Sequence, residues 1–313
     1  MSGMESSLPG NAPAGKAFKI RLPATSANLG PGFDAAALAM TLYLEVEAEK
    51  AAEFSIQATG RHAEICGRLE RNWLIQTYRE VLRAQGVEAS PLAIRMKNGI
   101  PLGMGCGSSA AVLLAGVALA AHFGELGWTA DQVLEEACAR EGHPDNAAAC
   151  WLGGFTVAAM EQGSVHAVAL KPKQRWKLML VLPRVPLATK TARALLPEKY
   201  LRADAVFNVQ RVALLTAAFA EGKPELLRVA MQDRMHQPYR QEVCPLLPKL
   251  LPLSGEGGVI GAALSGAGPA VLLVLEEGAA EAEVRDRVRH AIGDSEAEIL
   301  VCGIEPDAVS WGG

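Results

Sequence analysis

A glycine-rich segment between an expected strand and a long apolar helix constrains this 313-residue chain most strongly. Three alternate glycines let its backbone approach a ligand and turn N–H groups inward. The helix expected over 108–123 points its positive end at the same place, which predicts an anion site suited to phosphate. Either serine can cap that helix or reach a phosphate oxygen or Mg²⁺. The segment consists of Pro101, Leu102, Gly103, Met104, Gly105, Cys106, Gly107, Ser108, Ser109, Ala110 and Ala111.

Common nucleotide and hydrolase motifs are missing from the sequence. The Walker pattern G-x-x-x-x-G-K-[ST] and the dinucleotide pattern G-x-G-x-x-G are both absent around residue 105. The nucleophile pattern G-x-S-x-G is absent as well, which disfavours an α/β-hydrolase. Taken alone, the glycines of 101–107 are equally compatible with an ordinary turn before a serine cap.

Composition predicts a folded protein of two domains that binds neither nucleic acid nor a membrane. Half of the residues are hydrophobic, 20% are charged, and 30 basic against 34 acidic residues give a net charge of −4. The single basic cluster, 171–177, reads as a solvated turn between strands. The longest apolar run, 110–121, is shorter than the roughly 20 residues that cross a bilayer.

The termini and cysteines favour a cytoplasmic protein. Residues 1–16 are rich in Gly, Pro, Ser and Ala, and we expect a flexible tail there and no signal peptide. No pair of cysteines has C-x-x-C spacing, so reduced, buried thiols are expected. The six cysteines are Cys66, Cys106, Cys138, Cys150, Cys244 and Cys302.

Strands and helices alternate along the chain, which predicts an α+β or α/β fold. Expected strands are 19–23, 41–48, 54–59, 92–96, 155–160, 165–170, 177–182, 271–275 and 297–303. Expected helices are 72–84, 108–123, 130–140 with Thr129 as N-cap, 204–220, 224–232, 246–253 and 279–292. We divide the chain into a tail, 1–16, an N-terminal domain, 17–170, and a C-terminal domain, 171–313.

Four further segments bring polar side chains next to turns. The loop 23–34 brackets Asn28 and Asp34 with a Gly-Pro-Gly turn, and turn chemistry alone also explains those residue types. The segment 141–146 places Glu141 at the end of one helix and Asp145-Asn146 at the start of the next. Glu141 can bind Mg²⁺ through oxygen, whereas His143 is either a ligand contact or a loop histidine.

The two remaining segments lie in the C-terminal part. Residues 264–270 form a second glycine-rich turn before a strand. Residues 233–240 form a polar cluster after a helix, in which Arg240 can bind a carboxylate through its fork of N–H groups. An ordinary surface arginine is the alternative at that position.

In this order, the five segments resemble the GHMP small-molecule kinases. Residues 101–111 are similar to that family's phosphate loop, with Cys106 where leucine is usual, and 264–269 look like its C-terminal S-G-x-G motif. Within the family, 24–34, 141–146 and 236–240 look like the homoserine kinases. The resemblance extends from Lys19 to Glu276.

The resemblance implies a fold and a reaction. It implies an N-terminal domain like domain 2 of ribosomal protein S5 and a ferredoxin-like C-terminal domain. It also implies transfer of the γ-phosphate of ATP, with Mg²⁺, to the hydroxyl of L-homoserine. The products would be ADP and O-phospho-L-homoserine, on the route to threonine.

The resemblance also assigns roles by position. Ser109 and Glu141 look like the residues for Mg²⁺ and phosphate, with Asn146 beside them in catalysis, and 101–111 with Asn72 look like the nucleotide site. The residues that resemble the family's amino-acid site are Asn28, Asp34, His143, Asn146, Arg193 and Arg240. Their chemistry suits a zwitterion with one hydroxyl, because arginine pairs with a carboxylate, a carboxylate with ammonium, and an amide orients the hydroxyl.

The sequence departs from the family pattern at two places, and two alternative functions also remain open. Thr25 stands where serine is usual, and Met104 and Cys106 flank Gly105 where arginine and leucine are common. Another kinase of the family, for mevalonate or shikimate, and a non-catalytic nucleotide-binding module remain alternatives. The sequence leaves open whether the protein is a monomer or a homodimer.

Overall fold

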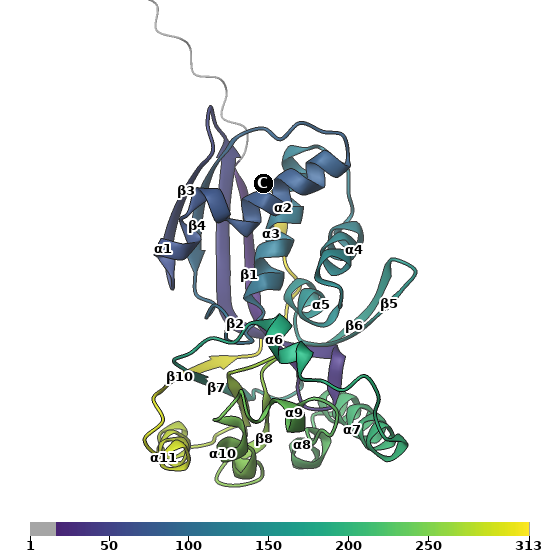
Figure 1. The fold of residues 1–313 in the computed structure, drawn as a ribbon, viewed down its shortest axis with the longest axis vertical. Coiled ribbons are helices and arrows are strands. Elements are labelled where there is room, and N and C mark those ends of the chain that lie inside the picture. The colour runs from purple at the N-terminus through teal and green to yellow at the C-terminus, as the bar shows by residue number, and fades with distance from the viewer. Residues whose placement is uncertain (1–16, 313) are drawn as a thin grey trace, which may run out of the picture.

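The computed structural model describes residues 17–312, which form two sheets with helices packed against them (Figure 1). The first sheet has the strand order β11-β1-β2-β4-β3. Its strands are β1 (Phe18–Asn28), β2 (Gly32–Lys50), β3 (Ser55–Gly60), β4 (Leu92–Asn98) and β11 (Trp311–Gly312). The start of β2 also pairs with β5 (Phe155–Glu161), which pairs with β6 (Ser164–Leu170).

Helices lie along one face of the first sheet, as Figure 1 shows. They are α2 (Trp73–Ala84), α3 (Ser108–Phe123), α4 (Ala130–Glu141) and α5 (Asp145–Leu152), with the short α1 (Ala63–Cys66) at the edge. The α3 helix is apolar nearly all round and is largely buried. Gly116 lets α2 pack closely, because a Cβ there would lie 2.8 Å from the carbonyl oxygen of Leu74.

The second sheet is antiparallel with the order β10-β7-β9-β8. Its strands are β7 (Lys177–Pro183), β8 (Val259–Leu264), β9 (Val271–Leu275) and β10 (Ala297–Gly303). Numbered along the chain, these strands have the order 4-1-3-2, which is ferredoxin-like. The accompanying helices are α6 (Thr189–Ala194), α7 (Arg202–Glu221), α8 (Pro224–Ala230), α9 (Gln237–Arg240), α10 (Leu247–Leu250) and α11 (Glu281–Ile292).

One hydrophobic core continues from the first sheet to the second. Phe155 of β5 stacks on Phe219 of α7 with ring centroids 4.3 Å apart, and Trp176 meets Phe219 edge-on. After β10 the chain returns to the first sheet, where the Glu305 N–H donates to Ala39 O and the Gly154 N–H donates to Glu305 O. The two sheets are therefore joined by packing and by two chain connections.

The α+β class and the ferredoxin-like second sheet are confirmed. Most predicted strands and helices are present within two or three residues at each end, and Thr129 caps α4 in a capping box with Gln132. The first two strands are longer than predicted, because β1 continues to Asn28 instead of ending at 23 and β2 begins at Gly32 instead of 41. The strand β8 and the helix α6 were not predicted. The helix expected over 246–253 divides into α10 and a 3-10 turn at Leu251–Leu253, where Pro252 has no N–H to continue the helix.

The division at residue 170 coincides with the change of sheet between β6 and β7, and the two-domain division stays a prediction. Residues 171–176 form the expected exposed turn there, with Trp176 as a buried exception. The predicted tail, 1–16, lies outside the described residues.

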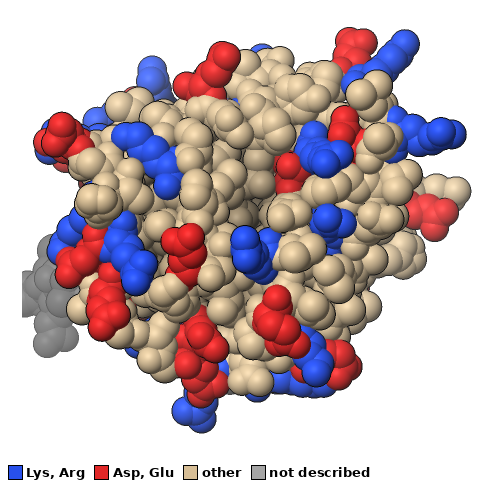
Figure 2. All heavy atoms as spheres, turned by 90° about the horizontal axis from the view of Figure 1, so that it is seen from below, with Lys and Arg blue, Asp and Glu red and all other residues tan. Residues whose placement is uncertain are grey.

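The surface carries charges of both signs, and the cysteines are not paired in disulfides. Lys, Arg, Asp and Glu are interspersed on the face shown in Figure 2, without a broad region of one sign. None of the helices within 17–312 is long and apolar enough to span a membrane. The six cysteines, which all lie inside this range, are free thiols, and Cys66 alone among them is partly exposed.

Candidate active site

A cleft of about 940 Å³ opens where the two halves of the molecule meet. Its walls come from the glycine-rich loop before α3, the α4–α5 connection, the start of β2, α6 and the 264–270 turn. Most of the predicted site residues line it. They are Asn28, Asp34, Asn72, Leu102, Gly103, Gly105, Cys106, Gly107, Ser108, Ser109, Glu141, His143, Asn146, Arg193 and Arg240, and Asp145 lines the cleft as well. The other predicted loop residues, Pro101, Met104, Ala110 and Ala111, are not among the residues that line the cleft.

The glycine-rich loop has the backbone that its sequence predicts. Gly103, Gly105 and Gly107 have φ angles of 68°, 75° and 67°, a region that favours glycine. Gly107 is the N-cap of α3, and no side chain caps the helix. The capping expected of Ser108 or Ser109 is therefore wrong, because these serines occupy the first helical turn. Both serines line the cleft at the start of α3, where no side chain caps the N–H groups.

The second glycine-rich turn packs directly against this loop. A Cβ on Gly105 would collide with the carbonyl oxygen of Ser265 and lie 2.9 Å from that of Gly268. Ser265 Oγ lies 2.8 Å from Gly105 O and 2.9 Å from Ser26 Oγ, so its hydroxyl donates to the carbonyl and accepts from Ser26. The phosphate-loop candidate is thus held by residues from both halves of the chain.

The turn between β1 and β2 is held in an unusual conformation. Asn28, Leu29 and Asp34 have φ angles of 69°, 47° and 55°, which non-glycine residues rarely adopt. Asn28 holds the turn closed, since its Oδ1 accepts from the Asp34 N–H and its Nδ2 donates to Gly266 O. Such strain is maintained by surrounding contacts and is frequent at functional sites. The predicted substrate contact of Asn28 stays a prediction beside this observed structural role.

Two arginines reach the cleft with different partners. Arg193 makes a bidentate ion pair with Asp34, with N–O distances of 3.0 and 2.6 Å. Arg240 is 1% exposed and has no carboxylate partner in the described part of the chain. Its N–H groups instead donate to His236 Nδ1, Ala192 O and Gly266 O. Burial lowers the pKa of Arg240, and the charge of Arg193 adds to that effect.

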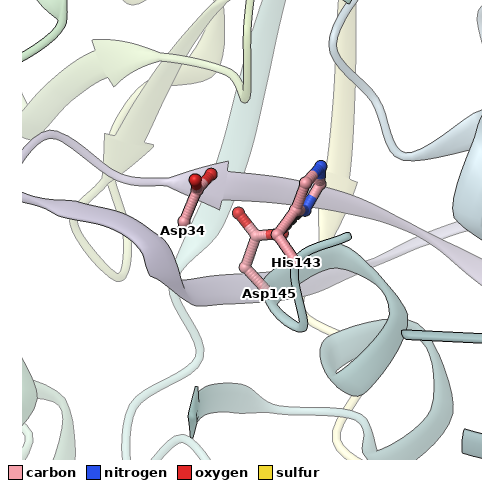
Figure 3. Close-up of side chains that lie close together, drawn as sticks. All are labelled: Asp34, His143 and Asp145. Atoms are coloured by element: carbon pink, nitrogen blue, oxygen red, sulfur yellow. Dashed lines mark hydrogen bonds and ion pairs between the residues drawn. The ribbon is translucent and has the colours of Figure 1, made fainter. Parts of the chain in front are cut away.

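The connection from α4 to α5 gathers several predicted groups. His143 Nδ1 lies 2.6 Å from Asp145 Oδ1, which also accepts the backbone N–H of Asn146. Figure 3 shows Asp34, from β2, close to the His143–Asp145 pair, and one ligand atom from each residue lies within 4.8 Å of the others. Thr25 donates its hydroxyl to Asn146 Oδ1 at 2.6 Å, a bond that serine can also make.

Charge at this connection is sensitive to burial. Burial by itself lowers the pKa of His143, but its hydrogen bond to Asp145 and the charges of Asp145 and Glu141 outweigh that effect and raise the pKa. Burial raises the pKa of Glu141, helped by Asp145 and opposed by His143 and Arg193. Glu141 Oε2 is buried without a hydrogen-bond partner among residues 17–312. An oxygen of this kind fits a ligand position for a divalent cation, and the serines at the start of α3 line the same cleft.

The far end of the cleft contains Asn72 and exposed apolar side chains. Asn72 caps α2 by accepting from the Leu74 and Ile75 N–H groups, and it donates to Cys66 O. Its predicted contact with adenine stays a prediction beside that role. Trp73 is 63% exposed on the cleft wall, which suits it to contact a flat aromatic ligand.

Some lining residues were not assigned a role from sequence. Phe33 lies below both guanidinium groups, with its centroid 5.5 Å from the Arg193 carbon and 5.6 Å from that of Arg240. Lys190 lines the cleft beside Arg193. Phe33 belongs to the segment 23–34, which was already singled out, whereas the available signal for Lys190 was its position three residues before Arg193. Cys106 is buried behind the loop, and burial raises its thiol pKa to about 12, which keeps it uncharged.

Comparisons with known proteins agree with this geometry. The family models of the GHMP kinase N-terminal and C-terminal domains match residues 72–154 and 215–293. A homoserine kinase of Solibacter usitatus is 46% identical over 264 residues, covering 83% of this chain and 86% of the relative. The chain belongs to the GHMP kinase family. The predicted resemblance is therefore confirmed, and the chain has the domains of ATP-dependent small-molecule kinases.

Solved structures of GHMP kinases share the fold. A crystal structure of homoserine kinase from Cytophaga hutchinsonii has a TM-score of 0.78 and 24% identity, covering 97% of this chain and all of that one. A mevalonate kinase from L. major has a TM-score of 0.70 and 18% identity, covering 94% and 98%. Since enzymes with different names share this fold, the substrate that accepts the phosphoryl group has to be inferred from the site residues.

The contact between Gly105 and Ser265 gives a testable prediction. Gly105→Ala should raise the KM for ATP and lower thermal stability, because the new Cβ meets backbone that cannot move independently. Gly127→Ala is the matched control: its φ is 67°, yet nothing lies within 4 Å, so it incurs only the backbone strain of roughly 1–2 kcal/mol. Equal thermal shifts and an unchanged KM for ATP in both variants would contradict the packing argument.

Proposed function

We propose that this GHMP kinase transfers the γ-phosphate of ATP to the hydroxyl of L-homoserine, giving O-phospho-L-homoserine and ADP on the route to threonine. The observation that carries the proposal is Arg240, a buried cation facing the cleft with only neutral acceptors around it. A buried charge without a counter-ion is costly, so its position in the cleft favours an anionic ligand group. The 46% identity to a homoserine kinase supports the same substrate.

The glycine-rich loop and the start of α3 would hold the phosphates of ATP. Backbone N–H groups and the Ser108 and Ser109 hydroxyls offer donors at the positive end of a 16-residue helix. Glu141, with its unpartnered oxygen, and Ser109 would hold Mg²⁺. The bound cation would offset charge on the phosphates. The exposed face of Trp73 and the region around Asn72 would accept the base.

The opposite side of the cleft would hold homoserine, the substrate that accepts the phosphoryl group. Arg240 would take the substrate carboxylate, and Asp34 the ammonium group, with Arg193 close to both. Asn146 has one oxygen bonded to Thr25 and one N–H directed to Asp145, which leaves its second N–H for the substrate hydroxyl. Phosphoryl transfer has a loose transition state, so positioning and charge neutralisation are the main requirements and no essential general base is assigned.

The charges favour homoserine over the alternatives. Mevalonate and shikimate carry a carboxylate but no ammonium, so either one would leave Asp34 without a cationic substrate group. A non-catalytic module would be expected to lose Ser109, Glu141 or the 264–270 turn, and all are present. We also propose a cytoplasmic location, which the free thiols support.

A panel of alcohols tests the proposal directly. With ATP and Mg²⁺, release of ADP should be fastest, by kcat/KM, with L-homoserine, and slower with mevalonate, shikimate and L-serine. Mass spectrometry should identify O-phospho-L-homoserine as the product. Equal or higher kcat/KM on mevalonate or shikimate would reject homoserine as the substrate.

Replacing Arg240 tests the carboxylate site. Arg240→Ala should cost about 2–5 kcal/mol of homoserine binding, seen as a raised KM, with the KM for ATP nearly unchanged. Arg234→Ala is a suitable control, because that arginine lies in the same segment but is half exposed and paired with Asp204. An unaltered homoserine KM in Arg240→Ala would rule out this assignment.

Replacing Glu141 tests the metal site. Glu141→Gln keeps the side-chain shape and removes the charge, so the Mg²⁺ concentration for half-maximal rate should rise and kcat should fall. Glu136→Gln serves as control, since Glu136 lies on the same helix and pairs with Arg140. A Mg²⁺ titration identical to that of the unaltered protein would mean that another group holds the metal.

A further inference from the structure

His236 is a fully buried histidine that contacts two walls of the cleft at once. Its Nε2 lies 2.7 Å from Gly30 O, and its Nδ1 lies 3.0 Å from Arg240 Nη1. A carbonyl oxygen only accepts and a guanidinium only donates, so the ring must carry its proton on Nε2 and a lone pair on Nδ1. His236 is therefore neutral, in agreement with burial, which lowers its pKa.

Asp233 fixes the backbone of this histidine. Its Oδ1 accepts from Asn208 Nδ2 and the Met235 N–H, and its Oδ2 accepts from the His236 and Gln237 N–H groups. The carboxylate is 3.7 Å from His236 Nε2, too far for a hydrogen bond. Asp233 thus orients the segment, and the imidazole remains free to bond Gly30 and Arg240.

We propose that His236 is a positioning residue for Arg240: its Nδ1 orients the guanidinium in the cleft, and its Nε2 joins that guanidinium to the turn that carries Asp34. This inference rests on the proposed function, in which Arg240 binds the substrate carboxylate. It adds a residue that acts through Arg240 and does not itself contact substrate.

The chemistry explains why a histidine suits this position. A carboxylate beside Arg240 would hold it equally well but would neutralise its charge and compete with the substrate carboxylate. A neutral imidazole accepts one N–H and leaves the positive charge uncompensated. The other two acceptors, Ala192 O and Gly266 O, are neutral as well. The substrate carboxylate would then be the first anion to bond Arg240 directly, since Asp34 and Asp233 act on it only as nearby charges.

Two substitutions distinguish the roles of the two ring nitrogen atoms of His236. In His236→Asn, the amide oxygen can replace Nδ1 as acceptor for Arg240, while the contact with Gly30 is lost. In His236→Gln, the longer amide can replace Nε2 as donor to Gly30, and Arg240 loses its acceptor. Loss of a hydrogen bond to a charged group should raise the homoserine KM about tenfold or more in His236→Gln. His236→Asn should restore the KM to within about threefold of the unaltered protein, and the KM for ATP should stay within about twofold in both.

A double-mutant cycle tests whether His236 acts through Arg240. If it does, adding His236→Gln to Arg240→Ala should change the homoserine KM by less than about twofold. Independent, multiplying effects of the two changes would overturn the inference, as would a normal homoserine KM in His236→Gln. Equal losses in the Asn and Gln variants would also overturn it, because the role would not then lie at Nδ1.

Controls distinguish folding defects and failure of the proposed function. His166→Gln changes a histidine with an exposed side chain and should leave the KM and thermal midpoint unaltered. Should His236→Gln fail to fold, Asp233→Asn provides a second test. Loosening the His236 backbone should raise the homoserine KM with little change in ATP binding, and an unchanged homoserine KM in that variant would overturn the inference.

If the unaltered protein does not phosphorylate homoserine, the proposed function fails. Turnover by the unaltered protein with a normal KM in His236→Gln rejects only the positioning role.

Discussion

The close approach of Gly105 to the carbonyl of Ser265 is the contact on which the rest of the site depends. It brings a loop of the first sheet's layer against a turn of the second sheet with no room for a side chain between them. The Ser265 hydroxyl then bonds Gly105 and Ser26, and the Gly266 carbonyl accepts from Asn28 and Arg240. One short turn therefore sets the position of the phosphate loop and of the opposite wall of the cleft.

The charged groups of the cleft are arranged in two ways. Asp34 and Arg193 satisfy each other across the start of β2 and α6, and both remain partly accessible. Arg240, by contrast, is buried and surrounded by neutral acceptors. The first arrangement keeps two opposite charges paired without a ligand, whereas in the second Arg240 has no directly bonded counter-ion. In the proposed complex, a ligand with both an ammonium and a carboxylate would place the ammonium beside the accessible Asp34 and the carboxylate beside Arg240.

The glycine-rich loop and the helix α3 could be predicted from the sequence, because both are determined by neighbouring residues. Alternate glycines at 103, 105 and 107 permit a tight left-handed backbone, and the apolar run after them favours a buried helix. What it could not predict depends on contacts between distant residues. The strand β8 contains Gly261, which is unusual in a strand, and the side chain of Met231 occupies the space that a Cβ there would take. Likewise, the serines at 108 and 109 looked like caps, but whether a hydroxyl folds back on the helix or faces a cleft depends on the loop geometry before it.

The path of the chain after β10 has a mechanical consequence. Residues 303–312 run back along β2 and α5 and end as β11 beside β1, so the second sheet lies between two connections to the first. A unit attached by a single linker can swing in any direction. One attached by two strands can rotate only about the line that passes through both, because any other motion would stretch one of them. Because the walls of the cleft come from both halves, any opening of the cleft would be restricted to a hinge about that one axis, which would keep the two walls in register.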